Sequence, residues 1–205
     1  MSAAIAVVLA VAGTWFARLQ PIQQGSTWMK PMSSGDAWEL ENSALTLGAG
    51  HSHNILVRQE PRAEITMRLT LRNDSSLDLK VIDPEPALAA KRAQSPVAIW
   101  QPQSLRFSAD IFSDKPAGKL TPPFTLAPGE EMRVEFTSTI GDPDRRFQRN
   151  SDGVATLSGI EVPLRFSWFG IPRTQNVPLD VQIAISPHAE DYLKPKADKI
   201  NTPAR

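Results

Sequence analysis

Two histidines separated by one residue are the part of this sequence that comes nearest to a metal site. His51 and His53 flank Ser52, and on a strand residues two apart share a face, so both imidazoles could reach one Cu or Zn ion. A third ligand would have to come from His188, Glu41, Glu60 or a methionine. Because two ligands do not make a site, we predict a polar loop here and no resident metal. A periplasmic Cu or Zn carrier that uses His51 and His53 is kept as an alternative.

The sequence has few of the groups that catalysis requires. It contains no Cys and three His, so a thiolate nucleophile is excluded and imidazole bases are few. It has no G-x-S-x-G elbow, glycine-rich phosphate loop or dinucleotide fingerprint. Glu130 and Glu131 are adjacent, but neighbouring strand residues point to opposite faces, which suits a turn better than an acid/base pair. We therefore predict a protein that is not an enzyme and that carries no cofactor.

Two stretches are rich in residue types that are enriched at protein interfaces. The first holds Trp28, Met29, Met32 and Trp38 among turn-forming residues, and the second is the loop with Arg145, Arg146, Phe147 and Arg149. The first stretch either packs along its own domain or docks on a neighbour. The second is either a solvated loop, offset by three nearby aspartates, or a docking epitope. We predict both sets as partner-binding residues.

The N-terminal segment is apolar. Residues 2–17 carry no charge and end before Arg18, and Trp15 and Phe16 beside that cation are typical of an interfacial anchor. Ile5, Val8 and Leu9 supply the apolar stretch before them. A bilayer span needs about 20 residues, so the segment is short. We predict an uncleaved membrane anchor in residues 1–18, with a cleaved secretory signal and a buried helix as the alternatives.

The charge balance bears on partners and orientation. Lys and Arg number 22 against 22 Asp and Glu, which argues against nucleic acid as a partner. The first basic residue follows the apolar segment, and by charge bias alone this places the body in the cytoplasm. An all-β body points to the other side. We predict an extracytoplasmic domain, periplasmic or extracellular, whose partners are the bilayer and an integral membrane protein complex.

The remaining chain alternates between apolar and polar residues, which is typical of half-buried strands. Six alternating segments are expected, at 64–72, 77–81, 105–111, 132–136, 160–168 and 177–185, with further strands possible at 37–47 and 54–57. Turns are expected at 73–76, at Pro128-Gly129 and at 171–176, and a short connecting helix at 88–93. The absence of a long helix favours an antiparallel sandwich of seven to nine strands.

Two stretches resemble a known class of domain. FTLAPGEEMRVEFT (124–137) is similar to the turn and following strand of many bacterial immunoglobulin-like domains, and GIEVPLRFSWFGIPRTQNVPLDVQI (159–183) resembles their terminal hairpin. The resemblance is generic; it implies a fold and no activity. The fold expected is an all-β, antiparallel immunoglobulin-like β-sandwich preceded by one N-terminal hydrophobic helix.

The organisation expected from these observations has four parts. They are an anchor or signal segment at 1–18, a linker rich in Pro, Trp and Met with possible first strands at 19–62, the sandwich at 63–186, and a polar tail at 187–205. The function expected is that of an accessory or assembly subunit of a larger membrane complex, acting by protein contact. A secreted, non-catalytic binding domain is the second alternative beside the metal carrier.

Overall fold

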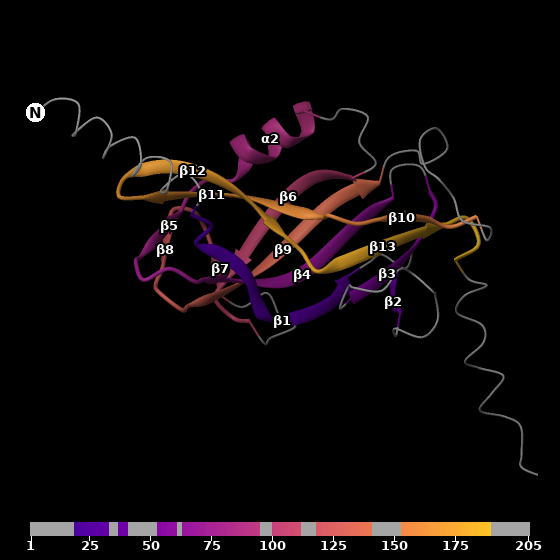
Figure 1. The fold of residues 1–205 in the computed structure, drawn as a ribbon, viewed down its shortest axis with the longest axis horizontal. Coiled ribbons are helices and arrows are strands. Elements are labelled where there is room, and N and C mark those ends of the chain that lie inside the picture. Colours follow the sequence, from indigo (N-terminus) through magenta and orange to yellow (C-terminus); the bar gives the residue numbers. More distant parts are fainter. Residues whose placement is uncertain are drawn as a thin grey trace, which may run out of the picture.

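A computed structural model describes residues 19–32, 37–40, 53–60, 63–94, 100–111, 118–140 and 153–189, with the backbone alone at 27–32, 37–40 and 53. These ranges hold 13 strands and the helix α2 (Glu85–Gln94) (Figure 1). The prediction of an all-β protein with antiparallel sheets is confirmed. Within the same ranges no helix combines the length and the apolar character that crossing a bilayer requires.

The strands form three sheets. The first sheet has the order β1 (Ile22–Met32), β4 (Glu64–Asn73), β9 (Glu131–Ile140), β6 (Trp100–Ser108) and β7 (Lys119–Leu120). The second sheet consists of β10 (Ala155–Leu157), β13 (Val181–Ser186), β3 (His53–Arg58) and β2 (Ala37–Leu40). The third sheet consists of β12 (Ile171–Pro178), β11 (Glu161–Trp168), β5 (Leu79–Val81) and β8 (Phe124–Leu126). Among these neighbours only β3 and β13 pair in parallel.

One hydrophobic core is shared by all three sheets. It includes Phe136 and Leu69 of the first sheet, Ile183 of the second, and Phe166 and Val81 of the third, each at most 1% exposed. The apolar positions of the alternating segments supply these side chains, because every second residue of a strand points to the same face. Burying them contributes about 1.5–3 kcal/mol for each large side chain. The alternation seen in the sequence is therefore the main determinant of this core.

Several strand predictions are confirmed and others are wrong in extent. Strands β4, β9 and β11 lie where the alternation placed them, and Pro128-Gly129 forms a turn in which Gly129 has φ +75°. The segment 177–185 is not one strand, because β12 ends at Pro178 and β13 begins at Val181 in another sheet. The expected turn at 171–176 is instead most of β12. The expected seven to nine strands become 13 in the described ranges, since four of them have only two or three residues.

Helix α2 begins three residues earlier than the sequence predicted. Asp83 accepts a 3.0 Å hydrogen bond from the amide of Glu85. Pro84 directly precedes the helix, and its carbonyl accepts bonds of 2.9 Å from the amide of Ala87 and 3.1 Å from that of Leu88. Ala87 and Leu88 are buried under the helix. Lys91 forms a 2.8 Å ion pair with Glu161 of β11, which fixes the helix beside the third sheet.

Strand β1 lies in the stretch where the sequence pattern is weak. It pairs with β4 from Ile22 opposite Asn73 to Met32 opposite Thr66, with register shifts after Gln24 and Met29. These bulges interrupt the period of two, which is why no alternation is visible in the sequence. At its start, Gln175 of β12 donates to the carbonyl of Ile22 and accepts from its amide. This contact joins the first sheet to the third.

Candidate functional site

The predicted partner-binding residues of the N-terminal stretch lie on two edge strands. Trp28, Met29 and Met32 belong to β1, at the edge of the first sheet, and Trp38 belongs to β2, at the edge of the second. The two strands contact each other, and they lie on the side of the molecule opposite α2 (Figure 1). The fold therefore brings these four positions onto adjoining sheet edges.

The other predicted residues lie outside the described ranges. This holds for the anchor residues Ile5, Val8, Leu9, Trp15 and Phe16, for the loop residues Arg145, Arg146, Phe147 and Arg149, and for His51. His53 opens β3, where its backbone pairs with Val181. Among the residues that the structure describes, no group of three His, Asp or Glu is arranged to hold a metal ion.

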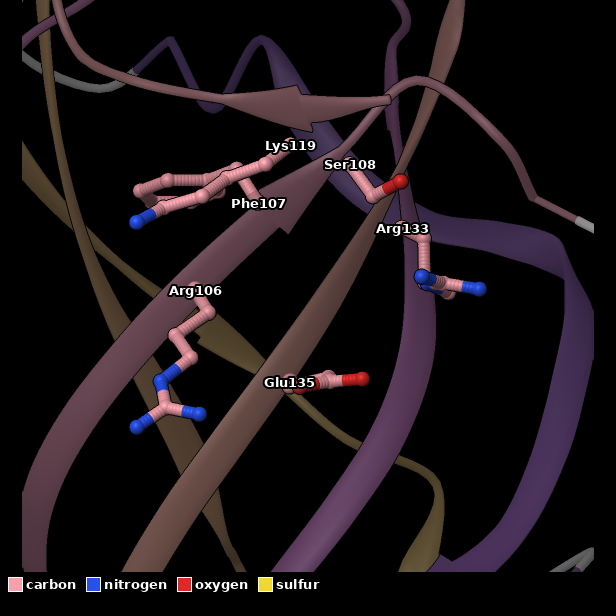
Figure 2. A pocket seen from close by; sticks show the side chains of 6 residues that line it. All are labelled: Arg106, Phe107, Ser108, Lys119, Arg133 and Glu135. Atoms are coloured by element: carbon pink, nitrogen blue, oxygen red, sulfur yellow. The ribbon is translucent and has the colours of Figure 1, made fainter. Parts of the chain in front are cut away.

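A basic pocket of about 390 Å³ lies on the polar face of the first sheet (Figure 2). Its lining includes Arg106 and Ser108 of β6, Lys119 of β7, and Arg133 and Glu135 of β9. The register explains this grouping, since Ser108 lies opposite both Arg133 and Lys119. Paired residues share a face and lie about 4.5–5.5 Å apart. Three strands thus concentrate their polar side chains on two successive rungs.

Among the described residues, the lining carries three cations and one carboxylate. Glu135 lies opposite Arg68 on one side and Arg106 on the other, and a 3.2 Å ion pair joins it to Arg68. Arg133 is only 2% exposed, whereas Arg106 and Lys119 reach solvent. The described part of the lining therefore has an excess of positive charge, which favours an anion. A carboxylate or phosphate group is the chemistry that matches it.

Sequence reasoning missed this pocket. Each of its charged residues occupies a polar position of an alternating strand, and such positions are ordinarily solvated. The grouping depends on strand order, which places β9 between β4 and β6, and one sequence does not reveal that order. The feature that would indicate such a pocket is a charged residue at each of several paired positions on neighbouring strands. It can be recognised only once the pairing register of the strands is known.

The carboxylates of Glu130 and Glu131 have separate structural roles. Glu130 accepts a 2.8 Å hydrogen bond from the amide of Ala127 and so closes the turn before β9. Glu131 reaches β1, where it accepts bonds of 3.1 Å from the amide of Ser26 and 3.0 Å from its hydroxyl. The two groups therefore stabilise different contacts.

Strand β1 is held against this face by close backbone contact. A Cβ placed on Gly25 would lie 2.5 Å from the Thr70 hydroxyl and 2.9 Å from a carboxylate oxygen of Glu131. Only glycine lets the bulged strand approach β4 so closely. The contact fixes where the edge residues that follow it lie.

No protein-family model matches the sequence, and no curated protein is significantly similar to it.

Proposed function

We propose that this protein is a non-catalytic accessory or assembly subunit of a membrane protein complex, and that it acts by protein contact. Its N-terminal segment anchors it in the bilayer, and its domain stands on the extracytoplasmic side. The observation that carries the proposal is the adjacency of β1 and β2. Their four large apolar residues, Trp28, Met29, Met32 and Trp38, are of the types enriched where interfaces bury most energy.

The domain is proposed to be an immunoglobulin-like sandwich with a hydrophobic helix before it. Antiparallel sheets around one shared core support this assignment. Strand edges also fit a role in assembly, because an edge strand offers backbone groups to a partner. The bulges in β1 and Pro31 within it limit pairing to short stretches, which favours a specific partner over general strand addition.

A photo-crosslinking experiment in native membranes tests the proposal. A benzoylphenylalanine residue replaces Met29 or Met32 in the full chain, and Ala90, exposed on α2 on the opposite side, is the matched control position. We expect one discrete adduct from the two β1 positions and none from Ala90. Equal labelling from all three positions would contradict a specific interface on β1.

Intact mass of the same membrane fraction tests the anchor separately. Retention of the N-terminal segment supports anchoring. Cleavage of a secretory signal after the small residues Ala10-Val11-Ala12 would give a protein that begins after residue 12, and this would support the alternative of a secreted binding domain. The Cu or Zn carrier has no supporting observation in the ranges that the structure describes.

The basic pocket supports a second candidate function, the binding of an anionic ligand. The excess of cations over carboxylates in its lining is the observation that favours it. Inorganic phosphate is a suitable probe, followed by chemical-shift changes at the backbone amides of Ser108 and Arg133, which both line the pocket. We expect saturable shifts that are lost in an Arg106→Glu/Lys119→Glu variant and kept in Lys80→Glu, a control on the third sheet. Equal shifts in all three proteins would exclude the pocket.

A further inference from the structure

The turn between β11 and β12 has a residue that the backbone disfavours. Strand β11 ends at Trp168 and β12 begins at Ile171, so Phe169 and Gly170 form a two-residue loop with φ of 51° and 77°. Positive φ at both central residues defines a type I′ turn, for which Asn-Gly and Asp-Gly are strongly preferred. A bulky Phe at the first position is an outlier. Such local strain persists where a side chain is needed for function.

The same turn collects exposed apolar surface. Phe169 is 71% exposed, Ile171 55% and Leu77 37%, and these are the exposed large hydrophobic residues of the described ranges. Leu77 lies with Trp168 and Phe169 around a hollow of about 400 Å³. Phe169 stacks on Trp168 with ring centroids 5.8 Å apart. We call Leu77, Phe169 and Ile171 the apolar tip; Trp168, on which Phe169 stacks, is only 6% exposed.

The apolar tip lies at the edge of the core. By register, Ile171 lies opposite Trp168 and on the same face as the buried Val177. Trp168 is only 6% exposed and belongs to the core, whereas Ile171 lies on β12, the edge strand of the third sheet. Among the described residues, β1 bonds to β12 at Gln175, four residues further along the strand, and Ile171 is open to solvent. Exposed apolar surface that is contiguous in this way marks a site of contact with a membrane or with a partner protein.

The start of the described chain lies at the same end of the molecule. Gln175 bonds the backbone of Ile22, and the amide of Asp180 donates to Gln24, so β1 and β12 run side by side in the same direction. The chain that precedes Ile22, back to Leu19, therefore leads toward the same end of the molecule as the part of β12 that precedes Gln175, which begins at Ile171. Figure 1 shows the indigo start of β1 on the side of the molecule that carries the β11–β12 turn.

A second contact places the loop of Leu77 there as well. The carbonyl of Pro21 accepts a 2.7 Å hydrogen bond from the amide of Asp74, at the start of the loop that leads to Leu77. The uncharged residues 2–17 thus join the domain at the end that carries the apolar tip. An anchor in these residues holds that end, and no other, against the bilayer.

We propose that the apolar tip inserts into the interfacial layer of the lipid bilayer and forms a second membrane contact beside the anchor. This inference rests on the proposed membrane anchoring. Phe and Leu are among the side chains that interfacial segments bury at the boundary between headgroups and acyl chains. Asp78 and Lys80 line the adjoining hollow beside Phe169 with opposite charges. Arg173 follows Ile171 by two residues on the same face of β12.

Fluorescence quenching in vesicles tests the inference. The chain has no Cys, so Phe169→Cys can be labelled at a single site with an NBD dye in the full chain. Thr156→Cys is the matched control, exposed on β10 and remote from the tip. The labelled proteins are reconstituted with phosphatidylcholine vesicles and floated on a density gradient. Quenching by doxyl-labelled lipid and by aqueous iodide is then compared.

We expect both proteins to float, with a blue-shifted NBD emission and doxyl quenching at position 169 alone. A label about 5–10 Å below the headgroups is shielded from iodide. If both proteins float and the label at position 169 is quenched by iodide as strongly as that at 156, the anchor holds and the tip proposal is overturned. If neither protein floats, the anchoring itself fails and the tip proposal fails with it.

A second variant separates insertion from folding. Phe169→Asn/Ile171→Thr suits the turn and the strand, so it keeps the fold. With the label placed at Leu77→Cys, we expect this pair of substitutions to lower doxyl quenching and to restore iodide quenching. Unchanged quenching at position 77 would show that Phe169 and Ile171 do not insert.

Discussion

The side chain of Gln175 links β1 to β12, and its removal has a predictable cost. Gln175 is 7% exposed and bonds both the amide and the carbonyl of Ile22, which is itself fully buried. Replacing it with Ala leaves two buried backbone groups without a partner. Each such group costs about 1–3 kcal/mol, so the free energy of unfolding falls by about 2–6 kcal/mol. That is a large part of the about 5–15 kcal/mol of a typical domain.

Urea unfolding of the full chain, followed by tryptophan fluorescence, measures this change. Asn176→Ala is the matched control, because its side chain is exposed on the same strand and its loss costs no more than about 0.5 kcal/mol. Gln175→Glu keeps an acceptor for the Ile22 amide but turns a carboxylate towards the Ile22 carbonyl, so it is destabilised as well. A loss below about 0.5 kcal/mol for Gln175→Ala would refute the reasoning, because water would then replace the amide.

Three further substitutions test the packing around the same strands. Asn73→Ala removes bonds to the carbonyls of Leu77 and Leu126 and is expected to cost about 2–4 kcal/mol of unfolding free energy in the same urea assay; a neutral result would contradict the role of this buried amide. Gly25→Ala drives a Cβ into the Thr70 hydroxyl and is expected to cost about 1–3 kcal/mol, in part recovered in a Gly25→Ala/Thr70→Ala double variant; additive losses would show that the two residues do not clash. Gly170→Ala meets no atom within 4 Å, so its expected loss of about 1–2 kcal/mol, measured as a lower melting temperature, comes from φ +77° alone; an unchanged melting temperature would contradict it.

The parts of the fold that the sequence predicts well are those with one simple cause. In β4, Ile65, Met67, Leu69 and Leu71 alternate with polar residues, and all four are at most 1% exposed. In β11 the same holds for Val162, Leu164 and Phe166. The alternation of apolar and polar residues is therefore sufficient to predict an uninterrupted strand that packs on the core.

The parts that sequence reasoning missed depend on contacts between distant segments. Strand β1 has bulges that remove its period, and its place is fixed by Gln175, which lies 153 residues away. Strand β13 is buried along its whole length, so its division from β12 leaves no sign in the alternation. Asp83 and Pro84 lie between β5 and α2, and both bond to amides of the first helical turn, so the helix begins three residues before the predicted 88–93.

For the candidate sites, too, the sequence predicts residue types but not the contacts between distant segments. The partner-binding residues predicted from the sequence lie on β1 and β2, and their role stays a prediction; the sequence does not reveal that these strands adjoin. It gave no indication of the basic pocket, whose residues come from three strands, or of the apolar tip. The tip depends on two facts that composition does not contain, namely the turn type and the place of Ile171 on an edge strand.

The two proposals together limit what the partner must look like. Distances along the bulged strand β1 can be counted on its neighbour β4, which pairs with β9 without a bulge. The β1 positions Ile22, Trp28 and Met32 lie opposite Asn73, Leu69 and Thr66 of β4, in that order. At about 3.3 Å per residue, Trp28 lies about 13 Å and Met32 about 23 Å along the strand from Ile22. In the proposed arrangement the tip and the start of β1 share the end that the anchor holds at the bilayer, so positions along β1 lie progressively farther from the lipid. A partner that engages Met32 therefore needs a folded region outside the membrane, and one that consists only of buried transmembrane helices does not fit.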